Sequence, residues 1–338
     1  MKGALLVNLG SPDSTDVKDV KKYLDEFLMD ERVIDVPYLL RAFLVKGIIL
    51  NTRPKKSAAA YKKIWWEEGS PLIVLSERLQ KKVIDRSDIP VALAMRYGNP
   101  SMEQGIKELV DRGVTEIFMI PLYPQFAMAT FETIEVLAEK IIEKKFPQVK
   151  ISTLPAFYND KNYIKVLSES IAKDLNENKP EHLLFSYHGV PERHIRKSDI
   201  TKSHCKIDGS CCNTPSEAHE FCYRHQCYQT TKNVASALNL KEGTYSTSFQ
   251  SRLGRDPWLQ PYTDATIDEF AQNGISNLSV VTPAFVSDCL ETLEEIGMEA
   301  KESFIENGGK QFNTIPCLND QDDWAQVIAN WINEWANA

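Results

Sequence analysis

The chain has 338 residues, of which 43% are hydrophobic and 25% are charged, an ordinary balance for a folded protein. This length suffices for one large domain or two ordinary domains with buried cores. The net charge of −8 and the dispersed Lys and Arg residues argue against nucleic acid as the main partner. The sequence lacks both an apolar run of about 18 residues and a signal-peptide pattern, so we expect a cytoplasmic protein.

Strands and helices are expected to alternate along the chain. Short apolar runs with turn residues nearby predict eight strands, and segments with helical periodicity separate them. Such an alternation is typical of the α/β class with parallel sheets. The predicted strands are residues 3–10, 90–97, 116–123, 149–155, 182–188, 244–250, 278–285 and 312–318.

The two halves of the chain resemble each other. "LLVNLGSP" (5–12) matches "LLFSYHGVP" (183–191), and "TLPAFYND" (153–160) matches "TIPCLND" (314–320). The pattern predicts two similar four-stranded α/β domains, which we expect at 1–157 and 158–320. A last helix at 321–336 is expected to pack back on the first domain. Since open α/β sheets bind ligands beyond the carboxyl ends of their strands, we expect a binding cleft lined by those loops.

One histidine and three acidic residues are candidates for chemistry. His188 stands at the end of the strand 182–188, before a Gly–Val–Pro turn. Asp288, Glu291 and Glu295 have i, i+3, i+7 spacing, which places them on one face of an α-helix that we expect to begin before Asp288. An imidazole opposite several carboxylates can bind a divalent ion or accept protons. The alternatives are a histidine in a packed turn and a solvated acidic face.

The stretch at 37–50, "PYLLRAFLVKGIIL", is apolar and can form a helix. It fits a flexible lip over a large hydrophobic ligand or a contact with a membrane surface, and core packing is the alternative. Arg53 follows the stretch and could meet ligand carboxylates, although ordinary surface charge is the simpler interpretation for a single cation.

Five of the seven cysteines lie between residues 203 and 227, in a polar segment with the spacing C-x₅-C-C-x₉-C-x₄-C. Thiols stay reduced in the cytoplasm, so these cysteines are expected to bind metal rather than to form disulfides. Cys289 and Cys317 stand apart and are expected to be small buried residues.

Taken together, several motifs resemble the ferrochelatase family over nearly the whole chain. They are "LLVNLGSPDS", "SAAAYKKIWWEEGSPL", "AMRYGNPS", "LYPQFAMAT", "FSYHGVPERH" and "SDCLETLEEI". The resemblance implies two Rossmann-like domains of the chelatase type and an enzyme, a lyase that inserts Fe²⁺ into protoporphyrin IX to make haem. It also implies that the porphyrin binds between the domains, between His188 and Glu291. Cys289 stands where some relatives have histidine, which puts a role of that side chain in metal delivery in doubt.

Within this interpretation the site residues take roles. His188 is expected to accept protons or bind the substrate iron on one face of the ring, and Glu291 is expected on the other face. Asp288 and Glu295 would form a proton or metal path behind Glu291. The expected substrate contacts are Leu9, Arg53, Tyr97, Tyr123, Phe126 and Phe285.

The family resemblance marks residues 199–227 as an insertion. Some bacterial ferrochelatases hold a [2Fe–2S] cluster in this internal segment, so we expect one here. The expected ligands are Cys205, Cys212, Cys222 and Cys227, with Cys211 as an alternative. A structural zinc site on the same thiols, or with His219 or His225, is the competing interpretation.

Two other functions compete with iron insertion into protoporphyrin. A related chelatase would use another tetrapyrrole, such as coproporphyrin III, or would insert cobalt. A two-domain protein that binds metal or ligand without turnover is the remaining alternative. The apolar stretch at 37–50 favours protoporphyrin, and the pairing of His188 with Glu291 favours an enzyme.

Overall fold

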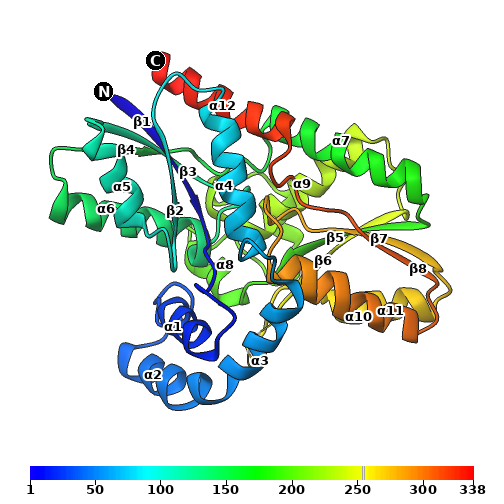
Figure 1. Ribbon diagram of the computed structural model, residues 1–338. Coiled ribbons are helices and arrows are strands. Elements are labelled where there is room, and N and C mark those ends of the chain that lie inside the picture. Colours follow the sequence, from blue (N-terminus) through cyan, green and yellow to red (C-terminus); the bar gives the residue numbers. More distant parts are fainter. Residues whose placement is uncertain (253, 255) are drawn as a thin grey trace. The chain divides into compact units, whose positions relative to one another are not determined.

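The structure is a computed structural model that describes residues 1–252, 254 and 256–338 (Figure 1). Its contacts divide the chain into two compact units. The first unit comprises Met1–Leu122, Met128–Pro155 and Asn319–Ala338, and the second comprises Tyr123–Ala127 and Ala156–Leu318. The short segment that follows the third strand therefore belongs to the second unit, although it lies far before the rest of that unit in sequence.

The first unit is built on a parallel sheet with the strand order β2-β1-β3-β4. In the middle of the central strand, Leu6 pairs with Leu93 on one side and with Ile120 on the other. Such a strand is buried on both faces, which is why it reads as a continuous apolar run. The strands are β1 (Lys2–Asn8), β2 (Val91–Met95), β3 (Glu116–Pro121) and β4 (Lys150–Thr153).

Helices surround this sheet. The α-helices are α1 (Val17–Leu28), α2 (Tyr38–Ala42), α3 (Leu50–Ile64), α4 (Pro71–Ile84), α5 (Met102–Asp111), α6 (Thr133–Lys145) and α12 (Asp322–Asn337), and the π-helical segments are η1 (Phe43–Ile49) and η2 (Met128–Glu132). The C-terminal helix α12 is tied to the first strand, because Lys2 Nζ donates to the carbonyl oxygen of Trp335 at 3.1 Å. The Trp335 ring also stacks on Phe118 of β3, with ring centroids 5.1 Å apart.

The second unit repeats the architecture, with a parallel sheet in the order β6-β5-β7-β8. Its strands are β5 (His182–His188), β6 (Tyr245–Gln250), β7 (Asn277–Val281) and β8 (Gln311–Thr314). Its helices are α7 (Lys161–Asn178), α8 (Glu192–Ser198), the 3₁₀ turns η3 (Ser210–Asn213) and η4 (Glu217–Phe221), α9 (Tyr223–Ala237), α10 (Thr263–Gln272), the π-helical η5 (Glu291–Ala300) and α11 (Lys301–Glu306).

Corresponding strands occupy the same place in both sheets, since β1 and β5 each lie between the second and third strand of their set. The predicted fold class, two similar four-stranded parallel sheets flanked by helices, is confirmed. Several strands are shorter than predicted. The strand expected at 278–285 ends at Val281, because Pro283 and its neighbours turn away from the sheet.

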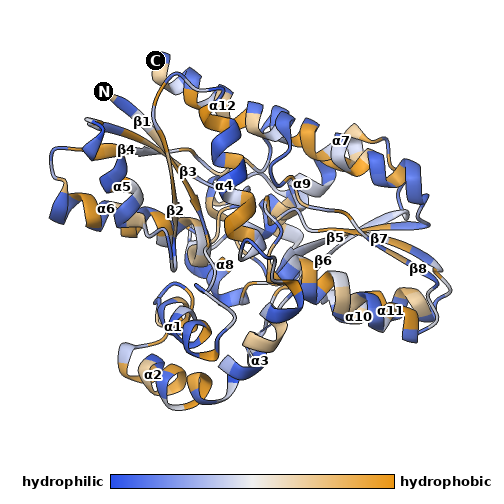
Figure 2. Cartoon of the chain, in the orientation of Figure 1, coloured by the Kyte–Doolittle hydropathy of each residue, from blue (hydrophilic) through white to orange (hydrophobic). Residues whose placement is uncertain are grey.

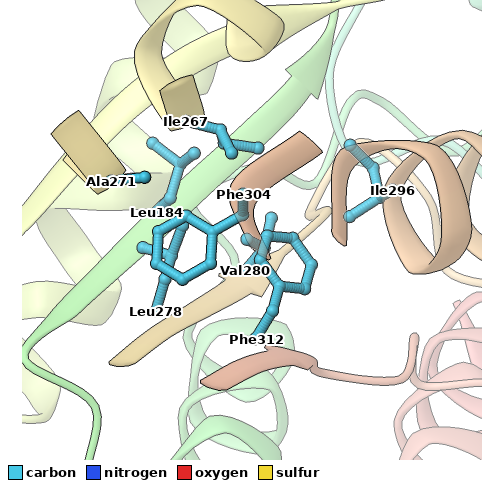
Figure 3. Close-up of a cluster of buried hydrophobic side chains, with 8 residues drawn as sticks. All are labelled: Leu184, Ile267, Ala271, Leu278, Val280, Ile296, Phe304 and Phe312. Carbon is cyan, nitrogen blue, oxygen red and sulfur yellow. The ribbon is translucent and has the colours of Figure 1, made fainter. Parts of the chain in front are cut away.

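A hydrophobic cluster in the second unit fixes the helix that carries the acidic residues. Ile296 of η5 is 1% exposed and packs with side chains from β5, β7, β8, α10 and α11 (Figure 3). Burial of one such side chain stabilises the fold by about 1.5–3 kcal/mol. The cluster therefore holds η5 against the sheet that ends in His188. Its members are Leu184, Ile267, Ala271, Leu278, Val280, Ile296, Phe304 and Phe312.

Within the described part of the chain, none of the helices combines the length and the hydrophobicity that crossing a membrane would require.

Candidate active site

His188 is the last residue of β5, and its side chain is half-buried. Its Nδ1 lies 2.7 Å from the carbonyl oxygen of Gly189. A carbonyl oxygen can only accept, so Nδ1 carries the proton and donates it. In the neutral imidazole the lone pair is then on Nε2. The Phe285 ring meets the imidazole edge to face, with centroids 6.2 Å apart, and thus limits the directions in which His188 can turn.

Gly189 allows the chain to pass close to the neighbouring strand. Its N–H donates to the carbonyl oxygen of Gln250 at 2.7 Å. A Cβ atom at position 189 would lie 2.8 Å from that same oxygen and 3.3 Å from the Trp258 ring. A side chain at this position would push the turn away from β6, and His188 would move with it.

Gln250 connects the strand of His188 to the helix of Glu291. Its carbonyl group holds the turn after His188, as described above, and its side chain is 4% exposed. Its Oε1 accepts from Ser186 Oγ at 2.7 Å, and its Nε2 donates to the carbonyl oxygen of Glu291 at 3.1 Å. One buried amide therefore fixes the backbone of Glu291 relative to β5.

The helix that begins at Glu291 is a π-helix, η5. Such i→i+5 helices are rare and often occur at functional sites. Glu291 and Glu295 both lie on it and are both partly exposed. The sequence predicted an α-helix with Asp288, Glu291 and Glu295 on one face. The structure has a π-helix instead, and only Glu291 and Glu295 lie on it.

Glu295 sits in a less polar environment than a surface glutamate. Burial raises its pKa to about 7, against a hydrogen bond from Ser251 that lowers it. Ser251 Oγ donates to Glu295 Oε2 at 2.5 Å. Ser251 has a φ of 63°, in the left-handed region that side chains rarely adopt. A carboxyl group with a pKa near neutrality can both take up and release a proton under physiological conditions.

Asp288 lies before the helix rather than in its first turn, because the chain becomes helical only at Leu290. Its side chain is 7% exposed. Asp288 Oδ1 accepts from Thr292 Oγ1 at 2.9 Å and from the backbone N–H of Cys317 at 3.4 Å. These bonds make Asp288 a brace for the start of the helix, which is a different position from the shared stripe that α-helical spacing predicted.

Two cysteines that looked isolated in the sequence flank these carboxylates. Cys289 and Cys317 are each 5% exposed. Burial raises the pKa of both thiols, as do Glu291 next to Cys289 and Asp288 next to Cys317. Both side chains are therefore neutral thiols, as expected for small buried residues.

Three of the expected substrate contacts lie in the second unit, together with His188 and Glu291. Phe285 contacts His188, as described above. Tyr123 and Phe126 are 6% and 7% exposed, and the Phe126 ring meets Phe221 edge to face with centroids 5.2 Å apart. The segment that contains them is held by Gln125, whose Nε2 donates to Thr230 Oγ1 at 3.1 Å.

The other three expected contacts lie in the first unit. Leu9 is half-buried and Arg53 is exposed. Tyr97 is fully buried, and its hydroxyl donates to Asp30 Oδ2 at 2.9 Å. Asp30 also pairs with Arg96. In this conformation Tyr97 is a core residue that presents no surface to a ligand.

The stretch at 37–50 exposes apolar side chains in the first unit. It forms α2 and the π-helical η1, and hydrophobic residues mark α2 on the hydropathy-coloured chain (Figure 2). Leu39 is 81% exposed and Phe43 is 64% exposed. The core alternative for this stretch therefore holds only for its inward residues, such as Val45, which is fully buried.

The cysteine-rich segment gathers three thiols around one cation, with a fourth bonded to one of them. The guanidinium of Arg224 is surrounded by Cys212, Cys205 and Cys211, whose proximity raises the pKa of Arg224 against the effect of burial. Arg224 Nη2 lies 3.4 Å from Cys211 Sγ. The thiol of Cys222 donates a hydrogen bond to the sulfur of Cys212, and this hydrogen bond lowers the pKa of Cys212.

Cys227 is more deeply buried than this group, although Cys212 is one of the side chains that raise its pKa. Its thiol is fully buried on α9, and burial raises its pKa. Its interactions are mainly with the phenol groups of Tyr163, Tyr187 and Tyr223. Throughout the described ranges, no three His, Cys, Asp or Glu side chains are arranged so that they could hold a metal ion.

Gln250 and Ser251 were missed by the sequence-based prediction. Both belong to "SFQS" at the end of β6. This strand end lies beside the end of β5, because His188 pairs with Gln250. The signal that could have found them is positional, because polar residues at the carboxyl end of a parallel strand point toward the ligand-binding edge.

Comparison with known proteins places this geometry in a family. The ferrochelatase family model matches residues 1–336. This chain belongs to the ferrochelatase family. It is 46% identical to a ferrochelatase of Opitutus terrae, covering 100% of this chain and 98% of that one. It is 49% identical to a ferrochelatase of Pseudomonas paraeruginosa, covering 96% of each chain.

Among solved structures, the fold is similar to that of SirB from Bacillus subtilis with Fe³⁺. The TM-score is 0.52 at 12% sequence identity, covering 98% of this chain and 94% of that one. The sirohydrochlorin chelatase SirB from Bacillus subtilis subspecies spizizenii, in complex with cobalt, gives the same TM-score and identity. At this identity the likeness concerns the fold alone, and it extends over both units of the family member described here.

Proposed function

We propose that this protein inserts Fe²⁺ into protoporphyrin IX to form haem, the terminal step of haem biosynthesis. The proposal is carried by one observation in a member of the ferrochelatase family: Gln250 ties the turn after His188 to the backbone of Glu291. The strand end that carries an acceptor nitrogen and the backbone that carries a carboxylate are thereby linked. The reaction requires such groups, because two pyrrole N–H protons must leave the ring as iron enters.

His188 is proposed to accept these protons, or to bind the incoming iron. Its Nδ1–H is committed to the carbonyl oxygen of Gly189, which leaves Nε2 as a base. Protonation at Nε2 then gives an imidazolium that is still oriented by the same hydrogen bond. A positioned general base of this kind typically contributes about 10²–10⁴-fold to a rate.

Glu291 is proposed to act on the opposite face of the ring, with Glu295 further along η5 as the next group of a proton or metal path. The pKa of Glu295, raised to about 7 by burial, suits a group that exchanges protons with solvent near neutral pH. Asp288 supports this path by bracing Thr292 rather than by lining it.

Apolar and aromatic side chains are proposed to grip the porphyrin in a bent form, which exposes the nitrogen lone pairs to the ion. Phe285, Tyr123 and Phe126 are the candidates in the unit that carries His188. Leu9 and Arg53 stay candidates in the other unit, and Tyr97 would have to leave its buried position to take part.

The test is anaerobic incubation of the purified protein with Fe²⁺ and a porphyrin while the Soret band is recorded. Protoporphyrin IX should be metallated, whereas His188→Ala should bind the porphyrin without metallating it. Faster metallation of coproporphyrin III would reassign the substrate, and preference for Co²⁺ would reassign the metal. Binding without turnover in the wild-type protein would leave only a binding function.

We further propose a [2Fe–2S] cluster held by Cys205, Cys211, Cys212 and Cys222, with Cys211 in place of Cys227. Three of these thiols lie near the Arg224 cation, which would offset the negative charge of thiolate ligands, and Cys222 bonds to Cys212. Since no three of them are arranged to hold a metal ion in the described residues, the thiols would have to move together around the cluster. The N–H of Lys206 also donates to Cys211 Sγ at 3.2 Å, and such bonds tune clusters. Iron enters and leaves the reaction as Fe²⁺, so the cluster would act structurally or as a sensor.

Anaerobically purified protein should then be brown and contain two irons and two sulfides per chain, as four-cysteine [2Fe–2S] ligation requires. Cys222→Ser should remove the colour. A colourless wild-type protein whose zinc has sulfur ligands at about 2.3 Å would replace the cluster by the alternative of a structural zinc site on thiols, with or without His219 or His225.

A cytoplasmic location with peripheral membrane contact through the lip, residues 37–50, is proposed on the exposure of Leu39 and Phe43. Apolar side chains that project from a short helix can enter the interfacial region of a bilayer. Co-sedimentation with lipid vesicles should be lost in Phe43→Ser, and equal sedimentation of both proteins would contradict the contact.

A further inference from the structure

Three of the six histidines of the chain lie in the cysteine-rich insertion, and two of them face one backbone oxygen. His204 Nε2 is 3.1 Å from the carbonyl oxygen of Cys211, and His219 Nε2 is 3.2 Å from the same oxygen. The two Nε2 atoms are 3.2 Å from each other. These three atoms form a nearly equilateral triangle.

Hydrogen bonds alone cannot satisfy all three edges of this triangle. If both imidazoles carry a proton on Nε2, both can donate to the carbonyl oxygen of Cys211, but the two N–H groups then face each other without an acceptor. If only one Nε2 carries a proton, the other Nε2 has a lone pair, and this lone pair faces a lone pair of the carbonyl oxygen and is repelled by it. A cation above the centre of the triangle would attract all three atoms at once.

The dimensions suit a transition-metal ion of borderline hardness. Zinc binds imidazole nitrogen and oxygen at about 2.0–2.2 Å, with tetrahedral geometry. Two ligands at a tetrahedral angle and these bond lengths stand about 3.3–3.6 Å apart. The observed edges are only slightly shorter, so small side-chain movements would complete a tetrahedral face, and solvent would supply the fourth ligand.

We propose that His204, His219 and the carbonyl oxygen of Cys211 bind one divalent metal ion, with Zn²⁺ as the preferred species. This site uses nitrogen and oxygen only and is separate from the thiols of the same segment. It does not depend on the proposed catalytic function. Its two histidines are half-buried, so that ions can reach them from solvent.

His225 is close to this site but is not one of its ligands. Its ring stacks on His219 with centroids 3.5 Å apart and an interplanar angle of 12°. An ion bound in the plane of the His219 ring would lie well outside the nearly parallel plane of His225, where that imidazole has no lone pair. His225 Nδ1 is also committed to the carbonyl oxygen of Cys212 at 2.9 Å. This residue therefore provides a matched control.

A metal at this position would connect three separate points of the insertion, at residues 204, 211 and 219. These points bracket Cys205, Cys211 and Cys212. The ion would thus fix the backbone that presents those thiols, and its loss should loosen the segment without altering a thiol.

The experiment is a titration of the purified full-length protein with Zn²⁺ in competition with a chromophoric chelator. Wild type and His225→Phe should each bind one more zinc than His204→Gln or His219→Gln. If His204→Gln and His219→Gln still bind the additional zinc, their affinity for it should be at least about 100-fold lower than that of wild type. Loss of an outer-shell partner costs only about 10–100-fold. The zinc K-edge spectrum of the additional ion should show nitrogen or oxygen at about 2.0 Å and no sulfur at about 2.3 Å.

Equal zinc binding by all four proteins would overturn the site, as would sulfur ligation of the additional ion. Loss of the ion in His225→Phe as well would show that the rings act only in packing and would also overturn it. If His204→Gln and His219→Gln do not fold, His219→Cys decides the question, since it should retain the ion and add one sulfur to its spectrum. Absence of that sulfur would refute the assignment.

Discussion

The raised pKa of Glu295 makes a quantitative prediction about folding stability. Burial raises this pKa from 4.5 to about 7. The unfolded chain therefore releases the proton at lower pH than the folded protein does. Between pH 4.5 and 7 the folded state binds more protons than the unfolded state, so the free energy of unfolding falls as pH rises. The raised pKa corresponds to about 3 kcal/mol of stability that is present below pH 4.5 and lost as the pH rises through about 7.

Glu295→Gln should remove this dependence, because glutamine stays neutral and its Oε1 can still accept from Ser251 Oγ. Relative to wild type, the variant should gain about 3 kcal/mol of stability between pH 4.5 and pH 8. Urea denaturation at both pH values measures this change, and comparing the two pH values cancels any constant effect of the substitution. Glu302→Gln, at an exposed residue of the following helix α11, is the control and should show no such gain, because Glu302 is not among the groups that shift the pKa of Glu295.

Parallel pH profiles for wild type and Glu295→Gln would refute the reasoning, since they would mean that Glu295 ionises in the folded protein as it does in the unfolded chain.

The remaining predictions concern the reaction, the lip and the cluster. Glu291→Gln should keep porphyrin binding but slow metallation by about 10²–10⁴-fold, as single-turnover kinetics can show; an unchanged rate would remove Glu291 from the mechanism. Leu40→Ser, at a side chain that is 48% exposed, should raise the KM for porphyrin by at most about 10–100-fold, from the roughly 1.5–3 kcal/mol of one apolar contact. Its melting temperature should not change, and an unchanged KM would exclude the lip from binding. Cys211→Ser should abolish the visible absorption of the cluster whereas Cys227→Ser should retain it, and the reverse pattern would restore the ligand set expected from the sequence.

The fold could be predicted from the sequence because each strand of these parallel sheets is buried on both faces. A run such as "ALLV" at Ala4–Val7 has no polar residue to interrupt it, and all four residues are fully buried. The internal match of 5–12 with 183–191 then indicated the same strand order in both halves. Periodicity of this kind depends on local residue types alone.

The details of the site depend on long-range contacts, which periodicity does not encode. Asp288 has the right spacing for the acidic stripe, but its bonds to Thr292 and Cys317 hold it outside the helix. Tyr97 follows a strand like a ligand contact, yet Asp30, 67 residues away in sequence, keeps its hydroxyl in the core. Strand-end position and residue spacing indicated His188 and Glu291, the resemblance to a family made them the central pair, and only the structure revealed Gln250 between them.

The internal repeat is asymmetric where chemistry is concerned. Thr153 and Thr314 match in the repeat and pair with Met119 and Val280, which pair in turn with Leu5 and Leu184. Counted along both strands from this pair, Leu9 corresponds to His188 and Gly10 to Gly189. A Cβ atom would lie 1.7 Å from the carbonyl oxygen of Tyr97 at Gly10 and 2.8 Å from that of Gln250 at Gly189, so both copies need glycine directly after this position. The first copy thus presents an apolar leucine where the second copy presents an imidazole, and only the second copy can accept a proton at this strand end.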